Sequence, residues 1–272
     1  MFPCDIVVET SAVCNARCIM CPQGKFKRPA FMDDDEFCNI IDQCVGRGLV
    51  QVSFSFYGEP LMDQRLEERV AYVNSKLPET HIIMFTNGSL LTKERSKGLL
   101  DAGMREFIFS IDSLDKQTYE SIRVGLDFDT VMRNLRDFRA VNDAMGNPAL
   151  LRIHMTAMPR NNAEVAKMRA LDGISVSVGP CDGRGKEGRE PHYGSLRTKG
   201  PCDILWNSLI VMTDGTAVMC CQDFLPSIPM GNVFEEGVEG VFNNAKYTKC
   251  RAIHARGWKD RIPLCADCWV TY

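Results

Sequence analysis

The chain has 272 residues, of which 45% are hydrophobic and 25% charged, with a formal net charge of −3 at pH 7. This charge gives no reason to expect nucleic acid or an anionic membrane as a partner, and no apolar run approaches the length of a membrane span. Residues 1–5 lack the features of a signal peptide, so we expect a cytoplasmic protein. Thirteen cysteines, an odd number, argue against a disulfide framework and favour free thiols that can bind metal.

Strand-like and helix-like segments alternate along the first 178 residues. Thr92 and Gly103 stand where a helix typically begins and ends. Six strands, each followed by helix, favour a parallel sheet, whereas eight would close a barrel. The predicted strands are residues 5–10, 50–56, 81–85, 106–111, 150–157 and 174–178. The predicted helices are residues 33–47, 65–76, 92–102, 115–123, 129–141 and 161–171.

The alternation ends after Gly179. Residues 180–194 are rich in glycine and charge and predict a loop. Residues 209–220 predict a hairpin that turns at Asp214 and Gly215, and a helix and a cysteine-bearing tail follow. We therefore expect two domains, residues 1–194 and 195–272.

Three cysteines, Cys14, Cys18 and Cys21, follow the first predicted strand in the spacing C-x3-C-x2-C. Three thiolates are one fewer than a closed four-iron cluster normally uses, so one iron would stay open for a small ligand. Buried core cysteines or a zinc site are the alternatives. The spacing resembles the signature of the radical S-adenosylmethionine (radical SAM) superfamily, although Met20 stands where that family usually has an aromatic residue.

The resemblance implies an α/β fold, an open partial (β/α)6 TIM-like barrel, with the cysteine loop at the C-terminal ends of the strands. It also implies a [4Fe-4S] cluster whose open iron binds S-adenosylmethionine (SAM). One electron, from a donor such as flavodoxin or ferredoxin, would split SAM into methionine and a 5'-deoxyadenosyl radical. That radical would remove a hydrogen atom from the substrate.

The second predicted strand ends in Tyr57, Gly58, Glu59 and Pro60. Glycine permits close approach of the backbone and proline fixes the turn, so an ordinary strand-end turn is one interpretation. The run also resembles the superfamily's Gly-Gly-Glu-Pro motif, with Tyr57 in place of the first glycine. The resemblance implies that its backbone and acidic side chain bind the amino group of SAM.

Polar residues also end the next two predicted strands: Thr86 and Asn87, then Ser110 and Asp112. By the same resemblance these strand ends approach the methionine and ribose parts of SAM, with Ser110 and Asp112 as ribose ligands. Arg123 would pair with the SAM carboxylate, for which a guanidinium is well suited. Each residue could instead serve as a helix cap or a surface group.

The C-terminal region carries Cys202, Cys220, Cys265 and Cys268. Their spacing resembles the shortened SPASM, or twitch, domain of some radical SAM enzymes. The resemblance implies a second, auxiliary [4Fe-4S] cluster that four thiolates close, and a zinc knuckle is the alternative.

Other thiols and imidazoles lie outside these motifs. Cys221 and Cys250 are spare thiols, and His81, His192 and His254 form no cluster typical of metal ligands.

Within the superfamily, residues 55–61, 86–88 and 230–232 and the twitch cysteines resemble dehydrogenases that oxidise a secondary alcohol of an aminocyclitol. This implies a polyol or amino sugar substrate, an auxiliary cluster that accepts an electron, and a setting in antibiotic biosynthesis. Arg184 corresponds by spacing to an arginine near the substrate and would orient the hydroxyl, unless it is a solvated loop residue. Gln222 stands where those enzymes have an acidic residue, which favours a different polyol or amino sugar.

Three other functions stay open. One is peptide modification by thioether formation or epimerisation, although only thirteen residues precede Cys14. A second is redox-neutral radical chemistry on a sugar. The third is a zinc or electron-transfer module without catalysis.

Overall fold

The computed structural model describes residues 1–23, 27–181, 201–266 and 268. Most of the predicted loop 180–194 and the domain boundary near residue 195 lie outside this part of the chain. The strands are β1 (Asp5–Val8), β2 (Gln51–Phe54), β3 (His81–Thr86), β4 (Glu106–Ser110), β5 (Leu150–Ala157), β6 (Ser175–Pro180), β7 (Ser208–Val211), β8 (Thr216–Val218) and β9 (Pro229–Asn232).

Within the described residues the strands form one nine-stranded sheet in the order β6-β5-β4-β3-β2-β1-β7-β8-β9. Strands β1 to β6 pair in parallel, which confirms the predicted parallel sheet. The sheet does not close, because β6 lies at one edge and β7 takes the free side of β1, with Asp5 opposite Ser208. The predicted hairpin is also confirmed, since β7 and β8 pair antiparallel. The C-terminal region therefore continues the sheet of the open barrel.

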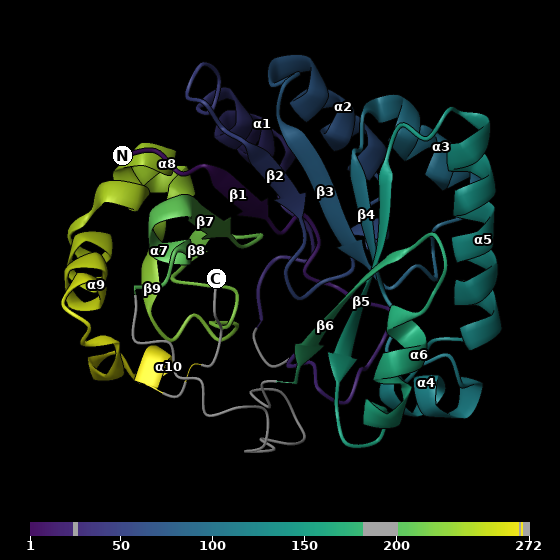
Figure 1. Ribbon diagram of the computed structural model, residues 1–272. Helices are drawn as coiled ribbons and strands as arrows, with labels where there is room; N and C mark the ends of the chain where they lie inside the picture. The colour runs from purple at the N-terminus through teal and green to yellow at the C-terminus, as the bar shows by residue number, and fades with distance from the viewer. Residues whose placement is uncertain (24–26, 182–200, 267, 269–272) are drawn as a thin grey trace.

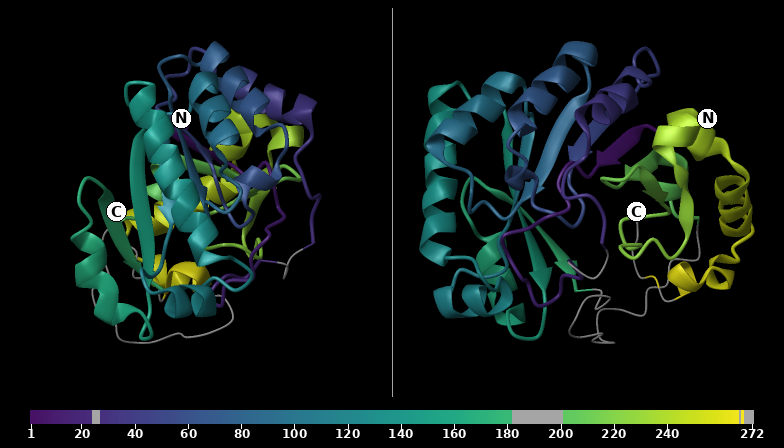
Figure 2. Two further views of the ribbon diagram at one scale, coloured as in Figure 1. Left: turned by 90° about the vertical axis from the view of Figure 1, so that its right-hand side faces the viewer. Right: turned by 180° about the vertical axis from the view of Figure 1, so that it is seen from behind.

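The longer helices of residues 34–144 lie on the outer face of the sheet (Figures 1 and 2), and the first of them also packs beside the helix of residues 233–243 in the C-terminal region. The α-helices are α1 (Asp34–Asp42), α2 (Leu66–Lys76), α3 (Lys93–Ala102), α4 (Lys116–Ile122), α5 (Phe128–Ala144), α6 (Val165–Arg169), α7 (Ile204–Asn207), α8 (Val233–Asn243), α9 (Ala245–Ala255) and α10 (Pro263–Ala266). The short 3-10 helices are η1 (Pro60–Met62), η2 (Asn162–Glu164) and η3 (Lys259–Arg261).

Local chemistry sets several helix ends as the sequence predicts. The side chain of Thr92 accepts a hydrogen bond from the amide of Arg95 at 3.3 Å and so caps α3. Gly103 ends the same helix with a left-handed φ of 104°. Asp33 caps α1 by accepting from the amide of Asp35 at 2.9 Å.

Three helix predictions differ from the structure. Helix α1 ends at Asp42, five residues early, and the chain then turns through Gly46 and Gly48, both with φ of 73°. The helix predicted over 161–171 is divided into η2 and α6. After the hairpin, the described residues form α8, α9 and the one-turn α10 where one helix was predicted, and Asn244 ends α8 and caps α9.

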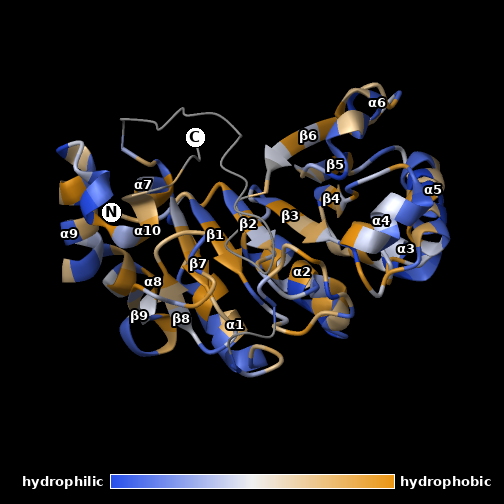
Figure 3. Ribbon diagram, turned by 90° about the horizontal axis from the view of Figure 1, so that it is seen from below, coloured by the Kyte–Doolittle hydropathy of each residue, from blue (hydrophilic) through white to orange (hydrophobic). Residues whose placement is uncertain are grey.

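The core lies between the sheet and the outer helices. Apolar side chains such as Val8, Phe54, Met84 and Phe107 are fully buried there. Figure 3 shows the apolar character of the central strands and the more polar surface of α5. No helix in the described ranges is both long and apolar enough to cross a lipid bilayer. Because β1 to β4 are parallel, the segments that follow them meet at one edge of the sheet (Figure 1).

Candidate active site

The loop that follows β1 carries Cys14, Cys18 and Cys21. Two backbone hydrogen bonds fasten it to the end of α4, from Arg17 to Val124 at 2.8 Å and from Ile19 to Ile122 at 3.0 Å. Burial raises the pKa of the Cys14 thiol to about 11, and the nearby Glu59 and the other two thiols add to the rise. Thiolates gathered in this way need a cationic partner, so the donor set fits an iron–sulfur cluster.

The turn that follows β2 lies directly against this loop. A Cβ atom on Gly58 would come within 1.8 Å of the carbonyl oxygen of Ser11, so only glycine allows the two backbones to approach. The amide of Glu59 donates to the carbonyl of Val13 at 2.8 Å. These contacts set the position of the turn relative to the cysteines.

The carboxylate of Glu59 is fully engaged with neighbouring protein donors. One oxygen accepts from the amide of Leu61 at 3.2 Å and from the hydroxyl of Thr86 at 2.6 Å, and the other accepts from the amide of Asn87 at 2.7 Å. Burial raises the pKa of Glu59, while these hydrogen bonds act in the opposite direction. The side chain therefore joins the end of β3 to the turn after β2.

Asn87 extends this connection to the cysteine loop. Its side-chain amide donates to the side-chain oxygen of Asn15 at 2.9 Å and lies 4.0 Å from the sulfur of Cys14. The side-chain amide of Asn15 in turn donates to the hydroxyl of Ser89 at 2.8 Å. The strand end predicted to approach SAM is thus tied to the loop predicted to hold the cluster.

Asp112 and Arg123 form a buried ion pair beside the same loop. Arg123 Nε donates to one oxygen of Asp112 at 2.6 Å, and the amide of Thr156 donates to the other at 2.8 Å. The Nη1 atom of Arg123 lies 3.9 Å from the sulfur of Cys18. Burial alone would lower the pKa of Arg123, but Asp112 and then Cys18 raise it overall. Ser110, at the end of β4, is half-buried and opposite His154.

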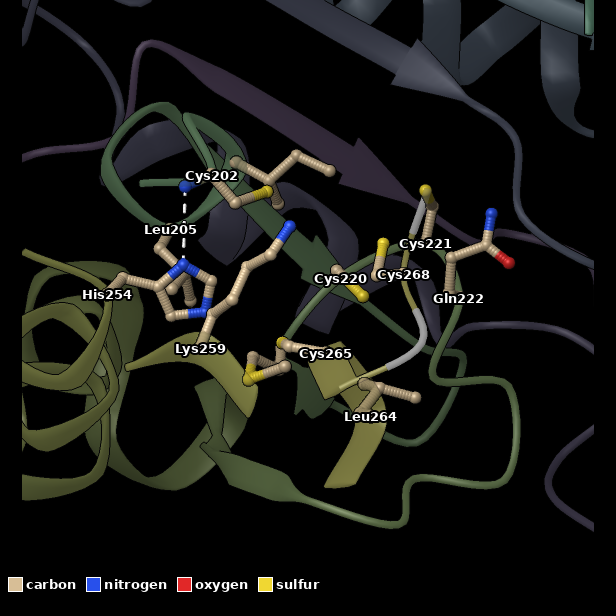
Figure 4. Close-up of a pocket in the computed structure, with 12 residues that line it drawn as sticks. Cys202, Leu205, Cys220, Cys221, Gln222, His254, Lys259, Leu264, Cys265 and Cys268 are labelled. Atoms are coloured by element: carbon tan, nitrogen blue, oxygen red, sulfur yellow. Dashed lines mark hydrogen bonds between the residues drawn. The ribbon is translucent and has the colours of Figure 1, made fainter. Parts of the chain in front are cut away.

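A cavity in the C-terminal region collects the second set of thiols (Figure 4). Burial raises the pKa values of the Cys202 and Cys220 thiols. The proximity of Cys268 adds to the first rise, and that of Cys265 to the second. The donor set fits a four-thiolate cluster. In the described ranges, no three His, Cys, Asp or Glu side chains are placed to share a single metal ion.

Sequence reasoning missed two residues of this cavity, Cys221 and His254, which both line it. His254 accepts a hydrogen bond at Nδ1 from the amide of Cys202 at 3.2 Å, across 52 residues of sequence. The sequence predicts that His254 belongs to no cluster of metal ligands together with His81 and His192, and the structure adds that it lines the cavity of the C-terminal cysteines. No local spacing marks His254, because its contact with Cys202 forms only when α9 packs on α7.

Tyr57 joins the turn beside the first set of cysteines to the cavity of the second set. Its hydroxyl donates to the carbonyl of Cys221 at 2.9 Å, and its ring packs edge-on against Phe224 with 5.6 Å between centroids. The sequence predicts Tyr57 as a substitute for a glycine, whereas the structure gives its side chain a contact with the C-terminal region. Arg184 and His192 lie outside the described residues.

The open sheet of parallel strands β1 to β6 and the two sets of cysteines define an iron–sulfur protein built on a partial barrel. The chain belongs to the radical SAM superfamily, whose family profile matches residues 8–170. Residues 202–269 match SPASM, an iron-sulfur cluster-binding domain. The protein is thus a radical SAM enzyme that uses a SAM-bound [4Fe-4S] cluster and an auxiliary iron–sulfur cluster, as the sequence resemblance implied.

Curated relatives include S-adenosyl-L-methionine-dependent 2-deoxy-scyllo-inosamine dehydrogenase of Niallia circulans. It is 24% identical over 266 residues, which cover 97% of this chain and 91% of the relative. A probable GTP 3',8-cyclase of Methanococcus maripaludis is 31% identical over 124 residues, covering 45% of this chain and 41% of that protein.

Solved structures share the fold. BtrN in complex with AdoMet and 2-DOIA has a TM-score of 0.66 at 22% identity and covers 98% of this chain and 93% of its own. Streptococcus suis SuiB bound to precursor peptide SuiA has a TM-score of 0.71 at 16% identity, covering 92% of this chain and 67% of its own. These identities support the fold alone.

Proposed function

We propose that this radical SAM enzyme oxidises a secondary alcohol of a cyclitol, an aminocyclitol or a sugar-like substrate to a ketone. The observation that carries the proposal is a hydrogen bond that joins the turn beside the first set of cysteines to the cavity of the second set. The hydroxyl of Tyr57, in the turn beside the first set, donates to the carbonyl of Cys221, which lines the cavity of the second. An electron acceptor held against the segment proposed to bind SAM suits an oxidation.

Sequence coverage supports the same choice. The similarity to the 2-deoxy-scyllo-inosamine dehydrogenase extends over 97% of this chain. The similarity to the GTP cyclase covers 45%. An activity that needs both parts of the chain is therefore favoured.

In this proposal the chain has two functional parts, residues 1–194 and 195–272. Cys14, Cys18 and Cys21 hold the first cluster. The auxiliary cluster has four ligands, which are Cys202, Cys220, Cys265 and Cys268. When bound, SAM on the first cluster would supply a 5'-deoxyadenosyl radical that takes the carbinol hydrogen atom; the hydroxyl proton would pass to solvent and the auxiliary cluster would accept the remaining electron.

The chain's own residues would position SAM at the edge of the sheet. The backbone of Tyr57 to Pro60 faces the cysteine loop, and Glu59 keeps the end of β3 against it. Arg123 brings a positive charge next to Cys18 and, with Asp112, gives the site a fixed charged pair. The SAM-binding set is Tyr57, Gly58, Glu59, Pro60, Thr86, Asn87, Ser110, Asp112 and Arg123.

Substrate recognition would fall to the C-terminal side of the site. Arg184 is proposed to orient the reacting hydroxyl. Gln222 lines the cysteine cavity and is neutral, so it would bind a hydroxyl or amine by hydrogen bonding without charge pairing. We therefore expect the substrate to be a polyol or an amino sugar other than 2-deoxy-scyllo-inosamine.

The test uses anaerobically reconstituted protein with SAM, a reductant and a panel of cyclitols and amino sugars deuterated at the carbinol carbons. We expect one substrate to yield one ketone per 5'-deoxyadenosine, with deuterium in the deoxyadenosine. Cleavage of SAM only in the presence of peptides would overturn the proposal. Deuterium transfer without ketone formation would instead indicate redox-neutral chemistry.

A further inference from the structure

His254 occupies an unusual position in the cysteine cavity. It lies on α9, is 2% exposed, and lines the cavity with the four thiols proposed to hold the auxiliary cluster. Its ring stacks edge-on against Trp206, with 6.4 Å between ring centroids. Packing against Trp206 and the hydrogen bond to Cys202 together fix the orientation of the imidazole.

The hydrogen bond from Cys202 determines which ring nitrogen carries the proton. A backbone amide can only donate, so Nδ1 of His254 must offer a lone pair at 3.2 Å. The single proton of the neutral ring therefore lies on Nε2. The tautomer follows from the partner alone, whatever occupies the cavity.

The Nε2 atom is a buried donor that has no hydrogen-bond partner among the described residues. Its accessible surface is below 1 Å², and none of the described residues accepts a hydrogen bond from it. Figure 4 shows this nitrogen on the side of the ring that faces Lys259 and Cys265, both of which line the cavity. A buried donor of this kind calls for an acceptor, because an unpaired one is costly and rare in folded proteins.

We propose that the Nε2–H of His254 donates a hydrogen bond to a sulfur of the auxiliary cluster, either a bridging sulfide or a ligating thiolate, and thereby makes the cluster easier to reduce. Hydrogen bonds to cluster sulfurs are one means by which proteins set reduction potentials. The cluster becomes more negative when it gains one electron, so a donor stabilises the reduced form more than the oxidised form. The half-buried Lys259 acts in the same direction through its charge.

His254 is thus a positioning residue for electron transfer, and it neither ligates iron nor touches the substrate. The inference rests on the proposed function, which gives the auxiliary cluster its task as electron acceptor. It adds a reason why this cluster, and not the SAM-bound one, would be the easier of the two to reduce.

The test measures the midpoint potential of each cluster by redox titration monitored by electron paramagnetic resonance, using the full chain with both clusters loaded. The variants are His254→Leu, which has no donor, and His254→Gln, which can accept from the Cys202 amide and still donate. His154→Leu is the control, because His154 pairs with Ser177 on the barrel side. Iron content is measured for each variant.

We expect His254→Leu to lower the equilibrium constant for reduction of the auxiliary cluster about tenfold. This equals a fall of about 59 mV in its midpoint potential for one electron. His254→Gln should recover most of this loss. The SAM-bound cluster and the His154→Leu control should not change. An unchanged auxiliary potential in His254→Leu, or an equal fall in both clusters, would overturn the inference.

A second measurement needs no variant. In wild-type protein labelled with ¹⁵N-histidine, pulsed electron paramagnetic resonance of the reduced auxiliary cluster should show hyperfine coupling to one imidazole nitrogen. Absence of this coupling would overturn the inference. The two proposals fail separately. If His254→Leu shifts the auxiliary potential but wild-type protein forms no ketone, the dehydrogenase function is refuted and the role of His254 stands. If ketone forms but the potential does not shift, the function stands and the role of His254 is refuted.

Discussion

Glu59→Gln changes one oxygen to an amide group at a site where every partner is a donor. Two donors, from Leu61 and Thr86, meet one carboxylate oxygen, and the Asn87 amide meets the other. Glutamine has a single acceptor, so in either orientation its NH2 group faces at least one backbone N–H. A buried donor left without an acceptor costs about 1–3 kcal/mol. At about 2–4 °C per kcal/mol, the melting temperature should fall by roughly 2 to 12 °C.

The matched control is Glu68→Gln, the same chemical change on the exposed face of α2. The side chain of Glu68 is 66% exposed and its ion-pair partner among the described residues is Arg65, so the melting temperature should stay within about 2 °C of wild type. Thermal unfolding is followed by circular dichroism, and SAM binding by calorimetry. Because Asn87 holds Asn15 next to Cys14, SAM affinity should fall about tenfold in Glu59→Gln, equivalent to about 1.4 kcal/mol. Equal melting temperatures for the two variants would refute the reasoning.

Two further substitutions test the packing of the site. Gly58→Ala forces a Cβ to within 1.8 Å of a backbone oxygen and should cost about 1–3 kcal/mol and weaken SAM binding. Gly240→Ala, with its nearest neighbour at 3.6 Å, should do neither, and similar urea midpoints for the two would contradict this. Asp112→Ala leaves the charge of Arg123 buried without a partner and should cost about 3–5 kcal/mol in urea unfolding. Lys97→Ala, in an exposed pair, is its control, and a midpoint shift as small as that of Lys97→Ala would count against the buried pair.

The sequence alone predicts the partial barrel, because the signals for each strand and helix lie within a short segment of the chain. Six short apolar strands and their helices can be recognised from spacing and caps such as Thr92, and parallel pairing then brings the ends of the strands to one edge. Parallel pairing alone predicts that the segments after β1, β2, β3 and β4 lie side by side. The early end of α1 was not predictable from apolar periodicity, since that pattern continues past Asp42.

The other features of the site depend on contacts between segments that are far apart in the sequence, and the spacing of residues does not predict such contacts. Tyr57 reaches Cys221 across 164 residues, and His254 reaches Cys202 across 52. A sequence motif also does not tell which way a carboxylate points. Glu59 and Asp112 were predicted as SAM ligands, and that role stays a prediction, but the structure adds that both carboxylates bind protein donors.

The most direct test of the account compares Cys220→Ser with Cys221→Ser, two neighbouring thiols in the same cavity. Only Cys220 is a proposed ligand, so iron should fall from about eight to about four per chain in Cys220→Ser and stay at about eight in Cys221→Ser. The decisive quantity is the ratio of ketone to 5'-deoxyadenosine with the active substrate. We predict a ratio near one for Cys221→Ser and wild type, and SAM cleavage without ketone for Cys220→Ser. A ratio near one in a Cys220→Ser protein that has lost the auxiliary cluster would contradict the claim that this cluster accepts the electron.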